Sequence, residues 1–313
     1  MGKHIFYFIV ILICNNIIGQ TIPLSIKENN VIGLRENEQF LNIIDLEVDN
    51  RGLLFVSDKI QCIVKVFDEK LNCIYNFGKK GKNPSEFKSL GRIAITKDYI
   101  IIADFASSRF QIFDKTLFYI KTLYAPGPII DIVAGKENSF FIGAYTGNKD
   151  KTLFEYQIGS FEEKNIILKS TIGDLFKDIY LLEKINDELF VAPYLIQNKM
   201  DIFNKKCENT IVIKELPKLP QMNRINKLNS VPKGNLIRGV AIDIFDNIYI
   251  LLDEYCKLKQ REILVYSIEK GHISTLVLPE ESKGIYIDSN NKLYSIINNR
   301  TLIKTYDIKY ENK

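Results

Sequence analysis

An aromatic residue followed by a polar residue closes a short strand-like run at six places along the 313-residue chain. The six pairs are Phe67-Asp68, Phe113-Asp114, Tyr156-Gln157, Phe203-Asn204, Tyr266-Ser267 and Tyr306-Asp307. Each pair follows a hairpin pattern, and neighbouring aromatics lie 46, 43, 47, 63 and 40 residues apart. A repeat of about 40 to 50 residues made only of strands is typical of β-propeller blades. The sequence therefore predicts an all-β chain with six blades.

Each predicted blade has four antiparallel strands, and the repeat makes residues 21–313 a single propeller domain. The blades are expected at about residues 42–78, 88–124, 129–168, 178–214, 238–279 and 284–308. The segment 284–308 supplies only three strands of the last blade, and an open ring would leave unpaired strand edges. We therefore expect residues 21–27 to pair with the blade that contains Tyr306 and to close the ring. The stretch 215–236 lacks alternation and is predicted to be a long loop between blades.

Residues 1–20 differ from the rest of the chain, because a short basic start precedes an unbroken apolar run at residues 5–14. About 10 apolar residues make a signal-peptide core, whereas a transmembrane helix needs about 20. We expect a signal peptide cleaved near Gly19; the alternatives are a buried N-terminal strand and an uncleaved anchor. A lipid anchor at Cys14 is disfavoured, because the branched Ile13 stands where lipoprotein signals carry a small residue. The expected location is extracellular, periplasmic or at the outer membrane.

Positive and negative side chains are interleaved along the chain rather than gathered in blocks. The chain has 42 basic and 38 acidic residues, which gives a net charge of +4. Binding to nucleic acid usually requires a concentrated basic surface. No nucleic-acid partner is therefore expected.

The first two predicted blades repeat each other at an offset of 46 residues, so that Asp58 corresponds to Asp104. The second carries the segments 77–87 (FGKKGKNPSEF), 93–95 (IAI), 102–104 (IAD) and 109–114 (RFQIFD). This pattern resembles the NHL repeat over residues 42–123, and more loosely over residues 240–266. The resemblance implies a secreted six-bladed propeller of the type found in Bacteroidetes.

Ligands of propellers usually bind on one face, near the central channel, where loops between blades meet loops joining second and third strands. The polar residues predicted on or next to these loops are Arg92, Asp104, Arg109, Tyr145, Tyr194, Arg238 and Asp253. Arg92 and Arg238 open innermost strands, so two guanidiniums could hold a carboxylate or a phosphate bidentately. Asp104 and Arg109 have a structural alternative, in which they pair with each other and pin the blade. The tyrosines are equally suited to packing and to stacking on a ligand.

Catalytic interpretations find little support in the residue types. After the leader, His272 is the only histidine, and it falls on a predicted outer strand. No catalytic residue and no cofactor is therefore expected, although a calcium site built from oxygen ligands such as Asp131 or Asp243 stays open. We expect a non-catalytic propeller that binds a protein, peptide or glycan. The alternative is a metal-assisted lyase or lactonase-type hydrolase. A carboxylate metal cluster at the pore would favour the enzyme, whereas a pore of arginine, tyrosine and apolar side chains would favour binding.

Overall fold

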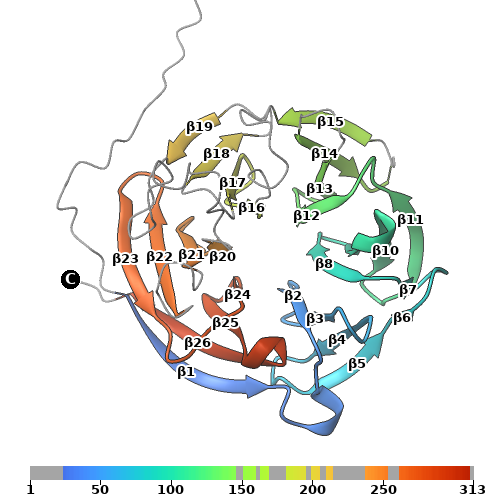
Figure 1. Cartoon of the computed structure of the whole chain (residues 1–313), viewed down its shortest axis with the longest axis horizontal. Coiled ribbons are helices and arrows are strands. Elements are labelled where there is room, and N and C mark those ends of the chain that lie inside the picture. Colours follow the sequence, from blue (N-terminus) through green and yellow to red (C-terminus); the bar gives the residue numbers. More distant parts are fainter. Residues whose placement is uncertain are drawn as a thin grey trace, which may run out of the picture.

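Six four-stranded antiparallel sheets surround a central axis in the computed structural model (Figure 1). The structure describes residues 24–145, 151–159, 163–168, 181–194, 199–204, 209–213, 237–252 and 261–310. Within each sheet, strand order follows the chain, with one exception in the last sheet. The predicted all-β, six-bladed propeller is confirmed.

The strands of the first three blades are consecutive hairpins. Blade 1 contains β2 (Ile43–Val48), β3 (Leu54–Asp58), β4 (Ile63–Phe67) and β5 (Cys73–Phe77). Blade 2 contains β8 (Leu90–Ile95), β9 (Tyr99–Asp104), β10 (Arg109–Asp114) and β11 (Tyr119–Tyr124). Blade 3 contains β12 (Ile129–Ala134), β13 (Ser139–Tyr145), β14 (Lys151–Gln157) and β15 (Glu163–Leu168). The short strands β6 (Lys79–Lys80) and β7 (Glu86–Phe87) form a separate parallel pair between blades 1 and 2.

The remaining blades follow the same plan. Blade 4 contains β16 (Glu183–Lys184), β17 (Leu189–Pro193), β18 (Met200–Asn204) and β19 (Asn209–Ile213). Blade 5 contains β20 (Ile237–Ile242), β21 (Ile248–Leu252), β22 (Glu262–Ser267) and β23 (Gly271–Val277). Blade 6 contains β24 (Gly284–Ile287), β25 (Lys292–Ile297) and β26 (Leu302–Tyr310), with β1 (Leu24–Ile32) on its outside. Single 3₁₀ turns lie at η1 (Glu36–Glu38), η2 (Phe105–Ser107) and η5 (Asn298–Arg300).

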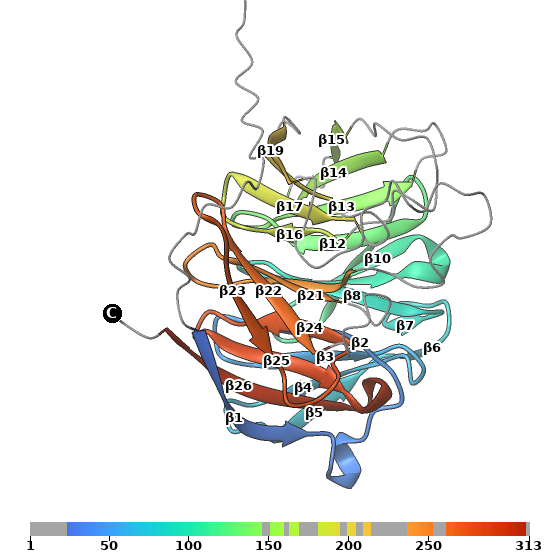
Figure 2. The same cartoon turned by 60° about the vertical axis from the view of Figure 1, so that its left-hand side comes forward.

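The N-terminal strand closes the ring, as the sequence predicts. Strand β1 pairs antiparallel with β26, and Glu28 lies opposite Tyr306 (Figures 1 and 2). The strand runs on past residue 27 to Ile32, whose side chain is buried in the core between blades 6 and 1. The first and last described strands thus share one sheet. Residues 1–23, including the expected signal peptide and Cys14, lie outside the described residues.

The six aromatics that mark the repeat have one structural role. All six are buried at equivalent positions of the third strands, where each pairs across the sheet with the beginning of the second strand. Each also belongs to a core cluster shared with the preceding blade; Phe113, for example, packs with Val64 and Val66 of blade 1. Large aromatic rings fill the space between twisted sheets and remove much apolar area from water. The repeat therefore recurs because every interface between blades needs such a residue.

Aspartates fix several of the hairpin turns between first and second strands. The Asp49 carboxylate accepts hydrogen bonds from the backbone N–H groups of Arg51 and Leu53, and Gly52 adopts a left-handed φ of 76°. Asp243 and Asp288 accept equivalent bonds in blades 5 and 6. Short polar side chains that bond the local backbone favour such turns.

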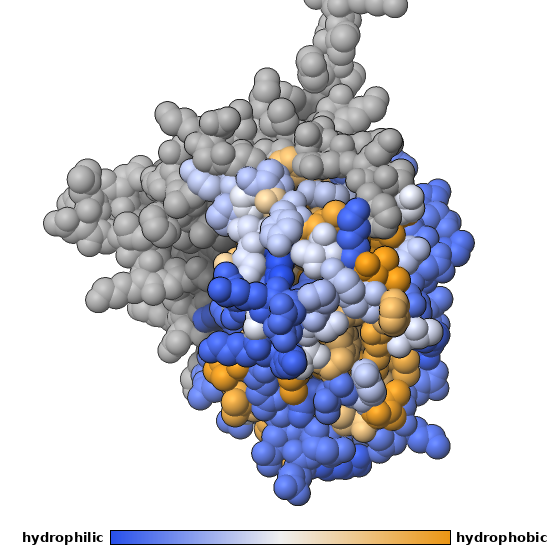
Figure 3. Space-filling view, turned by 90° about the vertical axis from the view of Figure 1, so that its right-hand side faces the viewer, coloured by the Kyte–Doolittle hydropathy of each residue, from blue (hydrophilic) through white to orange (hydrophobic). Residues whose placement is uncertain are grey.

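The outer wall of blades 1 and 2 is hydrophilic with apolar patches among the polar residues (Figure 3). Exposed apolar side chains on β5 include Ile74 and Tyr75, and Tyr124 is exposed at the end of β11. Among the described residues, no helix is long and apolar enough to cross a membrane.

Candidate functional site

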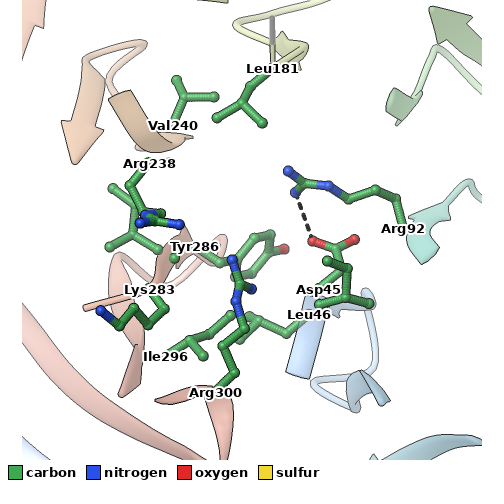
Figure 4. Close-up of a pocket in the computed structure, with 14 residues that line it drawn as sticks. Asp45, Leu46, Arg92, Leu181, Arg238, Val240, Lys283, Tyr286, Ile296 and Arg300 are labelled. Carbon is green, nitrogen blue, oxygen red and sulfur yellow. Dashed lines mark hydrogen bonds and ion pairs between the residues drawn. The ribbon is translucent and has the colours of Figure 1, made fainter. Parts of the chain in front are cut away.

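The innermost strands of the six blades line the central channel, and a cavity of about 170 Å³ lies among them. Its described lining divides into two kinds of side chain (Figure 4). The charged side chains are Asp45, Arg92, Arg238, Lys283 and Arg300, and the apolar ones include Leu46, Leu181, Val240 and Ile296. Tyr286 lies near the centre of this view, between Arg238 and Asp45.

β-Bulges place several of these charged side chains at the channel. The register of β8 shifts between Leu90 and Ile93, which brackets Arg92, and that of β20 shifts between Ile237 and Gly239, which brackets Arg238. A bulge bends its strand and re-aims the side chains of the extra residues. The two arginines therefore lie at equivalent irregularities of blades 2 and 5.

Arg92 is held between two buried carboxylates from neighbouring blades. Its Nη1 lies 3.0 Å from Asp45 Oδ1 on β2, and its Nε lies 3.4 Å from Asp131 Oδ1 on β12. Both carboxylates also accept backbone N–H groups of the next blade, at Ile93 for Asp45 and at Leu182 for Asp131. Burial raises the pKa of each aspartate, and the Arg92 guanidinium opposes that rise. This network ties blades 1 to 4 together around the channel.

Two glutamates close to this network have raised pKa values. Burial, reinforced by the negative charge of Asp131, raises the pKa of Glu183 to about 8. Burial and the charge of Asp45 also raise the pKa of Glu47 well above its ordinary range, and Glu47 hydrogen-bonds Tyr286. Proximity of like charges disfavours ionisation of all the carboxyls together. The surroundings of Arg92 therefore combine two paired aspartates with two glutamates whose ionisation is disfavoured.

Arg300 reaches the cavity from a turn of unusual geometry. The turn between β25 and β26 has three successive residues with left-handed φ: Asn298 at 47°, Asn299 at 54° and Arg300 at 72°. Arg300 Nη1 donates a hydrogen bond of 2.9 Å to the Ile43 carbonyl of blade 1. Burial, together with the positive charges of Arg238 and Arg92, lowers the pKa of Arg300 to about 10. The guanidinium groups of Arg92, Arg238 and Arg300 thus repel one another at the cavity.

The structure brings two of the predicted site residues together and places four others away from them. Arg92 and Arg238 line the same cavity. Asp104 and Arg109 lie away from it, buried and joined by a 3.1 Å ion pair. The Asp104 carboxylate also accepts the backbone N–H groups of residues 88 and 89, so the pair has the structural arrangement expected as the alternative to ligand binding.

The predicted tyrosines are half-buried at strand ends outside the cavity. The Tyr145 backbone N–H donates to the Pro128 carbonyl. The Tyr194 hydroxyl donates to Asp201 at 2.6 Å, and the Lys199 ammonium lies 4.5 Å from its ring centre. Asp253 and the loop at 215–236 lie outside the described residues.

The carboxylates proposed for calcium are engaged by protein donors. Asp131 accepts two backbone N–H groups in addition to Arg92. Asp243 accepts N–H groups and the hydroxyls of Tyr249 and Tyr310. Over the ranges that the structure describes, no group of three or more His, Cys, Asp or Glu side chains is arranged to hold a metal ion. His272 lies on the outer strand β23, as predicted, and packs against Tyr266.

Four residues of the cavity were not among the predicted site residues: Arg300, Lys283, Asp45 and Tyr286. Tyr286 and Asp45 lie on innermost strands, where their alternation with apolar residues is a signal of channel exposure. Arg300 follows two asparagines, a composition typical of left-handed turns, but nothing in the local sequence indicates the cavity.

No family model matches the chain, and no curated protein matches it. Solved propellers are similar in fold. A member of the DUF4221 family from Bacteroides vulgatus has a TM-score of 0.65 at 12% identity, over 93% of this chain and 100% of that one. A protein of unknown function from Bacteroides thetaiotaomicron has a TM-score of 0.64 at 12% identity, over 92% and 76%. A catalytically inactive histidine-to-alanine variant of virginiamycin B lyase from Staphylococcus aureus, with quinupristin, has a TM-score of 0.58 at 12% identity, over 90% and 99%. At identities this low, the similarity shows a common fold and carries no information about activity.

Proposed function

We propose that this chain is a secreted or envelope-associated NHL-like propeller that binds a protein, peptide or glycan at the mouth of its channel and performs no chemistry. The observation that carries this proposal is the described lining of the cavity, which consists mainly of arginine, lysine, tyrosine and aliphatic side chains. Arginine and tyrosine are the side chains most often responsible for binding energy in recognition sites, because they combine contact area with hydrogen bonding.

The alternative is a metal-assisted lyase or a lactonase-type hydrolase, and the structural similarity to virginiamycin B lyase supports it. A histidine-to-alanine variant of that lyase is catalytically inactive. In this chain His272 lies on an outer strand, and its Nε2 is 3.1 Å from the Thr275 hydroxyl. A histidine-dependent reaction at the channel would therefore need a residue other than His272, and we favour binding.

Peptide and glycan arrays probed with the full-length protein test the proposal. Leu181→Trp adds bulk to the cavity wall, while Val277→Trp places the same side chain on the exposed outer strand β23. We expect array ligands that Leu181→Trp loses and Val277→Trp retains. Ligands that bind both variants equally, or arrays with no ligand at all, would contradict a binding role for the cavity.

A further inference from the structure

The cavity combines positive charge with apolar surface. Its described lining contains four cationic side chains and one carboxylate, which is a net charge of +3. The aliphatic side chains of Leu46, Leu181, Val240 and Ile296 supply the rest of the wall. A site that fits one anionic group attached to an apolar body would satisfy both parts of the lining.

The charges are not equally available to a ligand. Arg92 already contacts two carboxylates, so its charge is compensated. Arg300 makes one hydrogen bond to a carbonyl, and no carboxylate within the described ranges lies at ion-pair distance from it. Burial, and in addition the positive charges of the neighbouring Arg238 and Arg92, lowers the pKa of Arg300, so the two arginines repel its guanidinium. An anion placed between Arg300 and Arg238 would relieve this repulsion, and arginine can bind it bidentately.

The turn that carries Arg300 is arranged at an energetic cost. Asparagine tolerates the left-handed conformation, but for Arg300 it costs energy, and strained residues of this kind cluster at ligand clamps. Asn298 Nδ2 donates to the Thr301 hydroxyl at 3.0 Å, and the Thr301 hydroxyl donates to the Asn298 carbonyl, so the turn is braced from within. The guanidinium is therefore held in the cavity before any ligand arrives.

The size of the cavity limits what it can hold. At about 170 Å³ it is smaller than the roughly 300–1,000 Å³ of pockets that enclose drug-sized ligands. A single amino-acid-sized group fits such a volume. The carboxylate of Asp45 nearby favours a singly charged group over a phosphate dianion, since like charges repel.

We propose that the cavity binds one carboxylate carried on a short aliphatic stem, with Arg300 and Arg238 on the carboxylate and Val240 and Leu181 on the stem. The carboxylate belongs either to a free small acid or to the C-terminal residue of a peptide. This inference rests on the proposed function and names the chemical group that the propeller recognises.

Calorimetric titration of the full-length protein with N-acetyl-leucine and with N-acetyl-leucinamide tests the proposal, because the amide removes only the charge. We expect the amide to bind at least about 10-fold more weakly, as loss of hydrogen bonds to a charged group implies. Arg300→Gln and Arg238→Gln should each weaken binding of the acid by about 10- to 100-fold. Arg51→Gln, an exposed arginine on the turn between β2 and β3, is the matched control and should bind normally.

Further titrations distinguish a peptide terminus from a free acid as the source of the carboxylate. A peptide ending in leucine that binds more tightly than N-acetyl-leucine would assign the carboxylate to a peptide terminus, and equal affinity would assign it to a free acid. Equal binding of acid and amide, tighter binding of inorganic phosphate, or an Arg300→Gln and Arg238→Gln pair that both bind normally would overturn the inference. If array ligands still lost affinity for Leu181→Trp after such a result, the proposed binding function would stand. Only the inference that the cavity binds a carboxylate would then be rejected. Thermal melting of each variant verifies that it is folded.

Discussion

Lys304 Nζ lies 3.0 Å from Glu28 Oε1, and so the last strand of the propeller is tied to the first by a side-chain ion pair as well as by the backbone ladder. Lys304 also pairs with Glu280, next to the loop that enters blade 6. These two glutamates raise the pKa of Lys304 above its ordinary value. The contacts join segments from opposite ends of the chain, and they close the ring without a covalent bond.

Ring closure depends most on the buried end of β1, and we expect Ile32→Ala to destabilise the protein by about 2–5 kcal/mol. Ile32 is 1% exposed and packs among residues of blades 6 and 1, including Phe40 and Ile303. Its removal leaves a cavity at the joint between the first and last blades. Chemical denaturation would measure the loss.

The matched control is Leu34→Ala, two positions further along the chain, because Leu34 is 67% exposed. Its effect should stay within about 0.5 kcal/mol, as for most surface substitutions. Similar effects of the two variants would show that β1 contributes little to closure.

The blade repeat and the ring closure could be predicted from sequence because both are properties of local patterns. An aromatic such as Phe113 recurs wherever two blades pack, and a final blade with three strands requires a fourth. Arg300 could not be predicted in the same way. Its partner is the Ile43 carbonyl, 257 residues away in the sequence, and the two meet only because the ring closes. The equivalent turns of blades 1 and 2, at residues 59–62 and 105–108, contain no arginine, so comparison between blades gives no signal.

The buried pair of Asp104 and Arg109 should be important for stability and not for binding. Asp104→Ala removes the carboxylate partner of a buried guanidinium and an acceptor for two backbone N–H groups. Breaking a buried pair by removing one partner costs about 3–5 kcal/mol. We expect the free energy of unfolding, measured by chemical denaturation at pH 7, to fall by that amount. The affinity for N-acetyl-leucine should be unchanged at a temperature where the variant is folded.

An exposed ion pair provides the comparison. Lys97, which is 62% exposed, lies 2.9 Å from Glu137, and Lys97→Ala should cost only about 0–1 kcal/mol. If Asp104→Ala were as mild as Lys97→Ala, or if it weakened ligand binding while stability was kept, the structural role of Asp104 would be wrong.

Chelation should leave the melting temperature unchanged. Calcium takes 6–8 oxygen ligands, whereas the oxygens of Asp131 and Asp243 already accept hydrogen bonds from the protein. Calcium and zinc contents of the purified protein, with thermal melting before and after EDTA treatment, provide the measurement. About one equivalent of metal and a lower melting temperature after EDTA would instead favour the lyase or hydrolase alternative.

Glu183 should make the stability of the propeller fall as the pH rises from about 4.5 to about 8. Burial raises its pKa from an ordinary 4.5 to about 8, so within this window the folded chain holds a proton that the unfolded chain releases. Stability falls with pH wherever the folded state binds more protons. Below this pH range Glu183 is protonated in both states, and the free energy of unfolding is not reduced. Above the range Glu183 is ionised in both states, and the reduction is at its full, constant value.

Glu183→Gln cannot ionise, so its stability relative to the wild type should rise across the same pH range. The exposed Glu188→Gln is the control, and unfolding curves between pH 4.5 and 9 give the comparison. A difference between Glu183→Gln and wild type that does not vary with pH would mean that Glu183 is ionised in the folded protein throughout, and that the channel contains more negative charge than the contacts around Arg92 imply.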